Sequence, residues 1–422
     1  MRKIRRINYK TILKIVGCII GSVILGCLSM ILVYLLPVDP MAANIARSSA
    51  LFDYEGVYPA WAVGYKTTQL DNWTEGYVLC SAIYPGENPV EDAMSNPIIE
   101  YVDESITLSL TLQANKVPGE TIENSYGRYW HGLLLLLKPL LLFFDIGDIR
   151  ILNMMLQLLL VFLVVVSLIE KGYKRMLLPF FLSLVIINPV TIPMSFTFSA
   201  EYLLMLLGCL VICNKHYQLK EKDRYYLFFC ILGVLTAFFN EMSYPVVTLG
   251  IPLFMYLAIE EKDWKQNICK EIMLSASWAI GYIGMWGGKW ICASLLTKKN
   301  YILDAFSQAN SYVAIEINEP TAWDRVFRNI MVIGRWPYLI IILGIIIFYV
   351  FKSRKYIFSD INWGNMIKRK LPFAILAVYP ILVFIALGNG YSYVHYWFSY
   401  RTLAITVMAG VYLFDIAKEK EK

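Results

Sequence analysis

Apolar runs of about 15 to 22 residues recur along the chain and alternate with short segments rich in lysine and arginine. A helix needs about 20 mostly apolar residues to cross a bilayer, so this pattern predicts an all-α membrane protein of about ten transmembrane helices. Several runs are short, so those spans must extend at their ends or thin the bilayer locally. The predicted spans are residues 15–36, 151–169, 176–190, 197–214, 225–239, 244–259, 272–293, 331–351, 371–388 and 402–416.

Basic residues collect in the segments that alternating spans would place on one side of the membrane. Cytoplasmic loops carry an excess of lysine and arginine, so this bias predicts cytoplasmic N- and C-termini in a multi-pass plasma-membrane protein. The first apolar run follows a basic start but is too long for a signal-peptide core, which predicts an uncleaved first helix. The basic segments, with 25 of the 38 lysines and arginines, are 1–14, 170–175, 215–224, 260–270, 352–370 and Lys418, Lys420 and Lys422.

One long polar segment follows the first span. From Pro37 to Arg128 it carries thirteen acidic and four basic residues, a net charge near −9 in a chain whose total is +6. This asymmetry predicts an extracytoplasmic first loop, residues 37–150, on a single polytopic membrane domain that spans 1–422. Within the loop, Gly132 to Phe144 is apolar but too short to cross, which predicts an interfacial helix at 131–144.

Composition narrows the class of protein further. With 58% hydrophobic and 17% charged residues, the chain lies outside the range of soluble domains, and we expect a lipid bilayer and no nucleic acid as its partners. Most cysteines lie in or beside apolar runs, so no disulfide framework is indicated. The three histidines form no cluster with metal-ligand spacing, so no metal and no other cofactor is predicted. A divalent metal held by loop carboxylates and a lipid phosphate is the open alternative.

Three stretches resemble the GT-C class of integral-membrane glycosyltransferases. Residues 129–169 run from YWHG through an apolar segment, a turn at Gly147 and Arg150 into a span, a pattern similar to that class. Residues 51–65, LFDYEGVYPAWAVGY, resemble its acidic first-loop motif, with the acidic pair split by Tyr54. Residues 395–403, HYWFSYRTL, resemble its aromatic–arginine motif before a late span.

The resemblance implies an activity and its location. It implies transfer of a sugar, with inversion, from a polyprenyl-phosphate or related lipid donor to a cell-envelope glycan, lipid or protein acceptor. It places the donor's sugar phosphate under the first loop, on the outer face. A flippase or transporter of lipid-linked saccharides, a polymerase or ligase with the same donors, and a scaffold with a degenerate site are the alternatives.

Glycosyl transfer requires a carboxylate to accept the acceptor's proton. Asp53 and Glu55 are the candidates in the acidic motif, and because they lie two residues apart only one could face the hydroxyl from a helix. The alternative for Asp53 is a cap on a helix that starts near Gly56. Asp71 and Glu75, four residues apart, form a second candidate pair, for which a solvent-exposed loop helix is the competing interpretation.

Transfer also requires cations that stabilise the departing phosphate. Arg401 follows Trp397 by four residues, so the indole could orient the guanidinium for bidentate phosphate binding; an interfacial anchor is the alternative. Arg335 and Lys289 lie inside predicted spans, where a charge marks either a functional site or a side chain that reaches the headgroups.

Other polar and aromatic residues are predicted at the same outer level. They are expected to contact the acceptor or line the cavity, and some sit at breaks between short spans, where irregular backbone is tolerated beside a cavity. This predicted set is His131, His395, Trp397, Tyr400 and Glu241, with Glu201 and Asn240 beside it.

Overall fold

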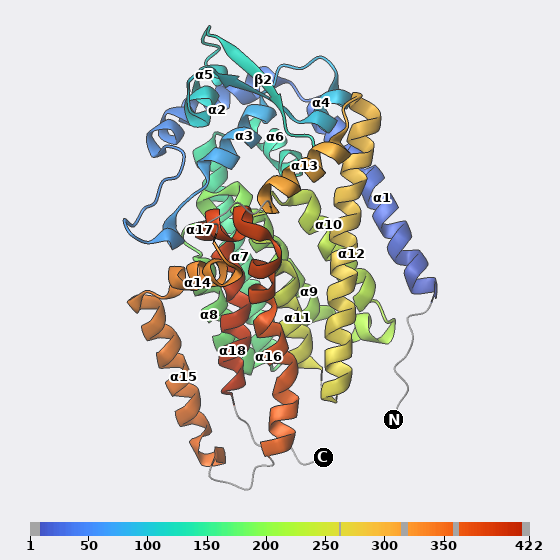
Figure 1. Cartoon of the computed structure of the whole chain (residues 1–422), viewed down its shortest axis with the longest axis vertical. Helices are drawn as coiled ribbons and strands as arrows, with labels where there is room; N and C mark the ends of the chain where they lie inside the picture. Colours follow the sequence, from blue (N-terminus) through green and yellow to red (C-terminus); the bar gives the residue numbers. More distant parts are fainter. Residues whose placement is uncertain (1–8, 261–262, 314–319, 358–362, 416–422) are drawn as a thin grey trace.

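The computed structural model describes residues 9–260, 263–313, 320–357 and 363–415, and 78% of these described residues are helical. Figure 1 shows a bundle of long helices with a smaller body of short helices and two strands packed on one end. We call this smaller body, formed by Pro37 to Asp145, the cap. The predicted all-α fold class is confirmed. The basic residues 418–422 lie outside the described residues.

A helix lies over each of the ten predicted spans. Among the described residues, five helices are long and apolar enough to cross a membrane: α1, α7, α9, α15 and α16; α10 and α11 are apolar but shorter. The chain is therefore an all-α protein with several candidate membrane helices, and the count of ten stays a prediction. The bundle helices are α1 (Tyr9–Tyr34), α7 (Ile146–Glu170), α8 (Leu177–Ile187), α9 (Phe196–Glu221), α10 (Tyr225–Phe239), α11 (Val247–Ile259), α12 (Trp264–Thr297), α15 (Trp336–Ile357), α16 (Trp363–Ala386) and α18 (Leu403–Leu413).

Three short helices of the cap, α3, α4 and α5, have first turns that are capped by side chains. Asp71, Asn88 and Ser105 each accept a hydrogen bond from a backbone N–H of the following helix, which satisfies a group that the helix start leaves free. The two strands pair antiparallel, with Pro97 opposite Ser125. The cap elements are α2 (Val38–Glu55), η1 (Lys66–Thr68), α3 (Asn72–Ala82), α4 (Pro89–Ser95), β1 (Pro97–Tyr101), α5 (Ile106–Ala114), β2 (Thr121–Ser125) and α6 (Leu134–Leu141).

Helix α6 occupies the segment predicted as interfacial. It has eight residues and buries Leu134, Leu137 and Leu141 within the cap. The Lys138 ammonium is buried as well, and its hydrogen bond to the Ala82 carbonyl at 2.6 Å compensates for the loss of water. Its position relative to a membrane stays a prediction.

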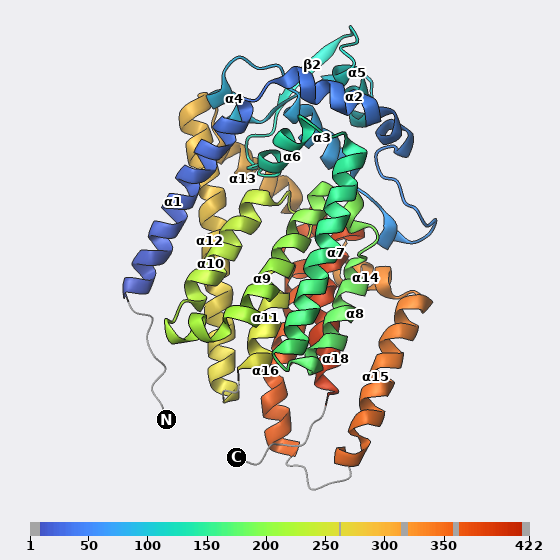
Figure 2. The same ribbon diagram turned by 180° about the vertical axis from the view of Figure 1, so that it is seen from behind.

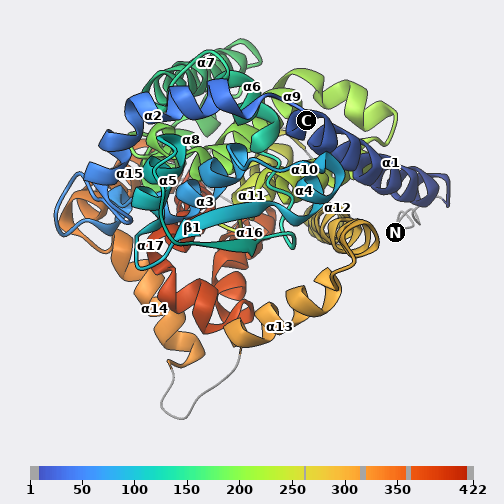
Figure 3. The same ribbon diagram turned by 90° about the horizontal axis from the view of Figure 1, so that it is seen from above.

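Several short elements lie between the bundle and the cap. Seen from above, α13, α14 and α17 lie along one side of the molecule (Figure 3). The bundle is also interrupted near the cap at residues 188–195 and 240–246, which connect short bundle helices. The remaining elements are η2 (Lys174–Met176), η3 (Ile192–Met194), α13 (Tyr301–Val313), α14 (Ala322–Ile333), the π-helical turn η4 (Gly390–Val394), α17 (Tyr396–Ser399) and η5 (Tyr400–Thr402).

The two ends of the bundle differ in charge. Figures 1 and 2 place the ends of α7, α9 and α15 and the starts of α12 and α16 away from the cap. These ends carry the described parts of the basic segments, whereas the cap carries the acidic segment. Helix α15 stands apart from the bundle centre and meets it through a small cluster around Leu182, Tyr349 and Val411.

Candidate functional site

The acidic motif of the first loop lies at the end of α2. Glu55 forms a two-pronged ion pair with Arg150, with N–O distances of 2.7 and 3.0 Å, and also accepts a hydrogen bond from Asn72 at 3.0 Å. Asp53 lies in the last turn of α2, and the chain leaves the helix at Gly56, whose φ is 72°. The expectation that Asp53 caps a helix starting near Gly56 is therefore wrong, because a helix ends there.

Asp71, from the second candidate pair, is buried rather than solvated. It is 5% exposed and caps α3 by accepting from the Thr74 amide at 3.1 Å and the Thr74 hydroxyl at 2.7 Å. Burial raises the pKa of the Asp71 carboxyl, while the two Thr74 donors and the charges of His395 and Arg401 act in the opposite direction. The cap carboxylate therefore lies close to the aromatic–arginine motif near the C-terminus.

Glu75 lies one helical turn further on and is also buried. Burial raises the pKa of its carboxyl to about 7; Arg150, the Ser195 hydroxyl and the Phe196 amide lower it, and Asp71 raises it further. The expected solvent-exposed loop helix is thus wrong for both carboxyls, because α3 lies between the rest of the cap and the start of α9.

Arg401 is fully buried, and backbone carbonyls surround its guanidinium. It donates to Ile187 at 3.1 Å, Trp397 at 3.2 Å and Thr67 at 3.4 Å, and it lies over the Phe198 ring. The side chain is fully buried and each guanidinium nitrogen donates to a backbone carbonyl, so Arg401 is not exposed as direct phosphate binding or an interfacial anchor would require. Arg401 instead joins α8, the C-terminal motif and η1.

The Thr67 carbonyl fixes the cap to the bundle. Besides Arg401, the Asn188 side chain donates to it at 3.0 Å, and the Tyr400 hydroxyl lies 3.5 Å away. The Tyr338 hydroxyl donates to the Thr67 hydroxyl at 2.8 Å. These contacts hold the segment that carries Lys66 on one side and Asp71 on the other.

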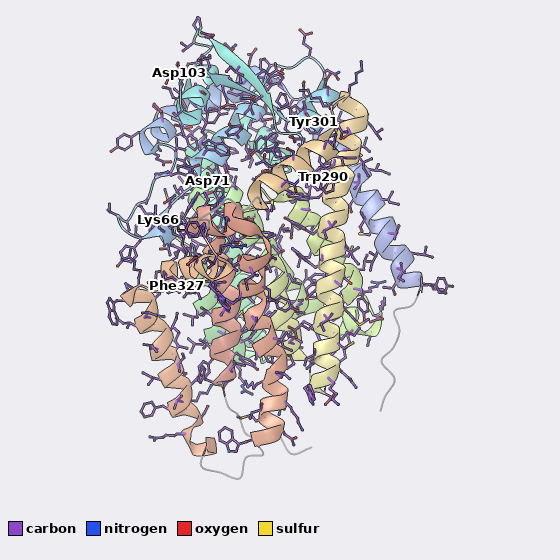
Figure 4. The ribbon with its side chains drawn as sticks, viewed as in Figure 1. Lys66, Asp71, Asp103, Trp290, Tyr301 and Phe327 are labelled. Atoms are coloured by element: carbon purple, nitrogen blue, oxygen red, sulfur yellow. The ribbon has the colours of Figure 1, made fainter. Side chains whose placement is uncertain are left out.

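A cationic cavity lies beside this segment, between the cap and α14. It has a volume of about 280 Å³, and three of its lining side chains are the cations Lys66, Arg328 and Arg335. Arg328 lies over the rings of Tyr393 and Tyr396, with 4.0 and 4.1 Å to the ring centroids. Figure 4 shows Lys66 next to Asp71 at the same edge of the cap. No carboxylate is among the described residues that line this cavity.

Arg335 precedes α15 and does not lie inside a helix, contrary to the sequence interpretation. One of its terminal nitrogens donates to the Gly64 carbonyl at 3.1 Å, and its side chain is exposed. Sequence reasoning did not identify Lys66 and Arg328, which line the cationic cavity together with Arg335. Arg328 lies on α14 and Arg335 lies beyond its end, so no helical spacing in the sequence indicated that the two would line one cavity.

A second, apolar cavity lies on the other side of the same cap segment. Its volume is about 400 Å³, and its walls come from residues 61–68, the connection after α8 at residues 188–190 and the start of α15. Its apolar and aromatic lining residues include Trp61, Tyr65, Val190, Pro337 and Ile341. The two cavities therefore flank η1, one cationic and one apolar.

An inner polar cluster lies deeper under the cap. His131 Nδ1 lies 3.3 Å from Glu241 Oε1, and burial together with the charge of Lys289 lowers the pKa of His131 to about 3. Lys289 is buried and donates to the Ala93 carbonyl at 3.0 Å, so it fastens α12 to α4 rather than reaching the cationic cavity or the membrane surface. Glu201 is also buried and accepts from the Tyr244 amide at 3.1 Å.

The remaining predicted residues belong to the C-terminal motif. His395 Nδ1 lies 2.6 Å from the Gly390 carbonyl oxygen, and its ring stacks on Phe398. The Trp397 ring lies edge-on to Tyr58 of the cap, with 5.4 Å between ring centroids. Tyr400 is fully buried. The motif thus packs against the cap next to Asp71, whereas His131, Glu241 and Lys289 form the separate inner cluster.

The structure brings Asp71, the C-terminal motif and the cationic cavity into one region. Glu55 is held in its ion pair with Arg150, and Arg401 donates to backbone carbonyls. Within the described ranges, no group of three or more histidine, cysteine, aspartate or glutamate side chains is arranged to hold a metal ion. No protein-family model, curated protein or solved structure matches the chain, so its function has to be argued from this geometry.

Proposed function

We propose that the protein is a membrane glycosyltransferase that takes a sugar from a polyprenyl-phosphate-type lipid and transfers it to a cell-envelope acceptor. The observation that carries the proposal is the segment from Lys66 to Asp71: Lys66 lines a cavity together with Arg328 and Arg335, and the buried carboxylate of Asp71 lies five residues further along the same edge of the cap. Three cations without a carboxylate in the described lining suit a phosphate. The apolar cavity on the other side of η1 suits the lipid chain that carries this phosphate.

The proposed reaction is a single displacement. The acceptor hydroxyl attacks the anomeric carbon of the donor sugar, and the bond between that carbon and the phosphate oxygen breaks. The acceptor's proton passes to Asp71, and the electron pair of the broken bond stays on the lipid phosphate. Lys66, Arg328 and Arg335 stabilise the charge that develops there, and the sugar is transferred with inversion.

Asp71 is preferred to the other cap carboxylates on grounds of geometry. Glu55 already neutralises Arg150, and Glu75 lies deeper, facing Arg150 and the start of α9. Asp71 is the carboxylate that interacts with His395 and Arg401 and that follows Lys66 by five residues. In this proposal Arg401 is a positioning residue, because it holds the Thr67 carbonyl and so fixes the segment between Lys66 and Asp71.

The charge of the two ends supports the expected orientation. The cap is acidic and the opposite end of the bundle is basic, as expected for a cap outside the cell and cytoplasmic chain ends. We therefore place the proposed site on the extracytoplasmic face of the plasma membrane. Lipid-linked sugars would then enter from the outer leaflet beside α15.

The test compares two carboxamide variants in transfer from purified polyprenyl-phosphate hexoses in nanodiscs. Asp71→Asn should lower turnover by about 10²-fold or more while donor binding persists, because the base acts mainly in the transition state. Asp103→Asn is the matched control, since Asp103 is an exposed carboxylate of the same cap. Full turnover by the Asp71→Asn variant would overturn the assignment of the base. Failure of the wild type to bind any polyprenyl phosphate would overturn the function.

A lipid transporter is the second candidate, and the position of α15 favours it. This helix meets the bundle through a small cluster and borders the apolar cavity with Pro337 and Ile341, so a lipid could pass beside it. A fluorescent polyprenyl phosphate in proteoliposomes separates the two functions. Movement between leaflets without sugar transfer would favour the transporter, and transfer without such movement would exclude it.

A further inference from the structure

Aromatic rings from distant parts of the cap form one row. On α3 the ring centroids of Trp73 and Tyr77 are 4.3 Å apart, and Tyr77 lies 5.5 Å from Tyr126, which follows β2. Tyr126 and Tyr129 stack at 5.3 Å with an interplanar angle of 14°. Each ring in this part of the row therefore touches the next one.

The row continues onto α12. Tyr129 meets Trp286 edge-on at 5.4 Å, and Trp286 lies 5.8 Å from Trp290. Trp286 and Trp290 are four residues apart and share one face of the helix. We call this row the aromatic track and define it as Trp73, Tyr77, Tyr126, Tyr129, Trp286 and Trp290.

The aromatic track packs against the hydrophobic core through Trp73, Tyr77 and Trp286, but it differs from the fully buried core rings in exposure and in its polar neighbours. All of its rings except Tyr129 keep part of their surface exposed, whereas core rings such as Phe180 and Phe229 are fully buried. Glu100 accepts from the Tyr77 hydroxyl at 3.1 Å. The Arg128 guanidinium lies over the Tyr126 ring at 4.2 Å and pairs with Asp304 of α13 at 3.2 Å. Arg128 and Tyr129 both stack on the Tyr126 ring, so the surface open to a ligand is the exposed part of Trp73, Tyr77 and Trp290. Partly exposed aromatic rings with polar groups beside them are a common lining of ligand sites.

One end of the aromatic track lies at the proposed base. Trp73 follows Asp71 by two residues. Tyr58 interacts electrostatically with both regions: burial, together with the charges of Asp71 and Tyr126, raises the pKa of its hydroxyl to about 12. Figure 4 places Asp71, in the cap, and Trp290, on α12, at about the same level. The track therefore leads away from the carboxylate that would receive the acceptor's proton.

We propose that the aromatic track binds the acceptor and that the acceptor is a carbohydrate chain of several sugar units. A pyranose ring has apolar C–H faces that pack on aromatic rings and hydroxyl edges that bond to groups such as Glu100, Arg128 and Asp304. Five successive ring-to-ring steps of 4.3 to 5.8 Å extend further than one sugar ring covers. The inference rests on the proposed function for its reaction, since the track ends at the proposed base.

The first experiment measures binding without any donor. Chitohexaose, maltohexaose and cellohexaose are titrated into the full-length protein in nanodiscs by isothermal calorimetry. At least one should bind with a Kd of about 1 mM or tighter, and Trp73→Ala and Trp290→Ala should each weaken that binding about tenfold. Trp290→Phe should retain most of it, because the ring face remains. Trp323→Ala is the control, since Trp323 is 72% exposed on α14 outside the track.

The outcomes separate this inference from the proposed function. If none of the three hexasaccharides binds at up to about 10 mM, or if the alanine variants bind them like the wild type, the acceptor assignment is overturned. Sugar transfer by the wild type would leave the glycosyltransferase proposal intact in that case. Conversely, hexasaccharide binding that needs Trp73 and Trp290 in a protein without transfer activity would keep the carbohydrate site and remove the reaction. Thermal unfolding of each variant shows whether it has folded.

Discussion

Neutralising Glu55 distinguishes a structural carboxylate from a catalytic one. Glu55 and Arg150 are 15% and 10% exposed in their side chains, and their two N–O distances of 2.7 and 3.0 Å describe a bidentate pair. Glu55→Gln removes the charge and one acceptor oxygen and leaves the Arg150 guanidinium largely buried without its main partner. Removing one member of such a pair costs about 3–5 kcal/mol, and the partial exposure here reduces this to about 2–4 kcal/mol.

This loss should appear as a lower melting temperature. At about 2 cal/mol/K of unfolding entropy per residue, 1 kcal/mol corresponds to about 1 °C for a chain of this length, so we expect a decrease of at least about 2–4 °C. Retained helices in the unfolded state of a membrane protein reduce that entropy and enlarge the shift. Turnover per folded molecule should stay within about threefold of the wild type, because Glu55 does not touch the reacting atoms in the proposed site.

The matched control removes both charges. The Glu55→Gln, Arg150→Gln double variant should be less destabilised than the sum of the two single variants, by about 1–3 kcal/mol, because neither charge is then left buried alone. Fluorescence-detected melting in nanodiscs and sugar-transfer assays on the same samples measure both effects. An unchanged melting temperature together with a 10²-fold loss of turnover in Glu55→Gln would refute the structural role and restore Glu55 as the base.

Three further predictions concern pH, donor binding and topology. Because burial raises the folded-state pKa of Glu75 to about 7, its contribution to stability is complete below about pH 4.5 and is lost as the pH rises through 7. Glu75→Gln should therefore reduce the pH dependence of the melting temperature between pH 5 and 8. Lys66→Gln should raise the KM for the lipid donor about tenfold by removing a cation of the cavity, whereas Lys116→Gln, which changes an exposed lysine of the cap, should not. Equal effects would exclude the cavity as the phosphate site. A cysteine near Glu100 should react with an impermeant thiol reagent from outside and one near Asn365 should not; the reverse labelling would invert the proposed orientation.

The arrangement of the proposed site depends on long-range contacts that could not be predicted from the sequence. Sequence spacing suggested Asp53, Glu55 and Arg401 as the reacting set, but it could not show that Arg150 would bind Glu55. It also could not show that the carbonyls of Ile187, Trp397 and Thr67 would surround Arg401. Whether a carboxylate is solvated or paired depends on neighbours far away in the chain, and no local pattern specifies them.

By itself, the sequence determined the helical character of the chain and the position of nearly every long helix. This follows from local physics, because the length and apolarity of each run decide whether it forms a membrane-type helix. It also marked the acidic segment that became the cap. Only the tertiary structure decided which side chains meet: Arg335 reaches Gly64 across 271 residues, and Arg401 reaches Thr67 across 334. Asp71 and Glu75 became buried for the same reason, since burial depends on how α3 packs against α9 and not on the residues of α3.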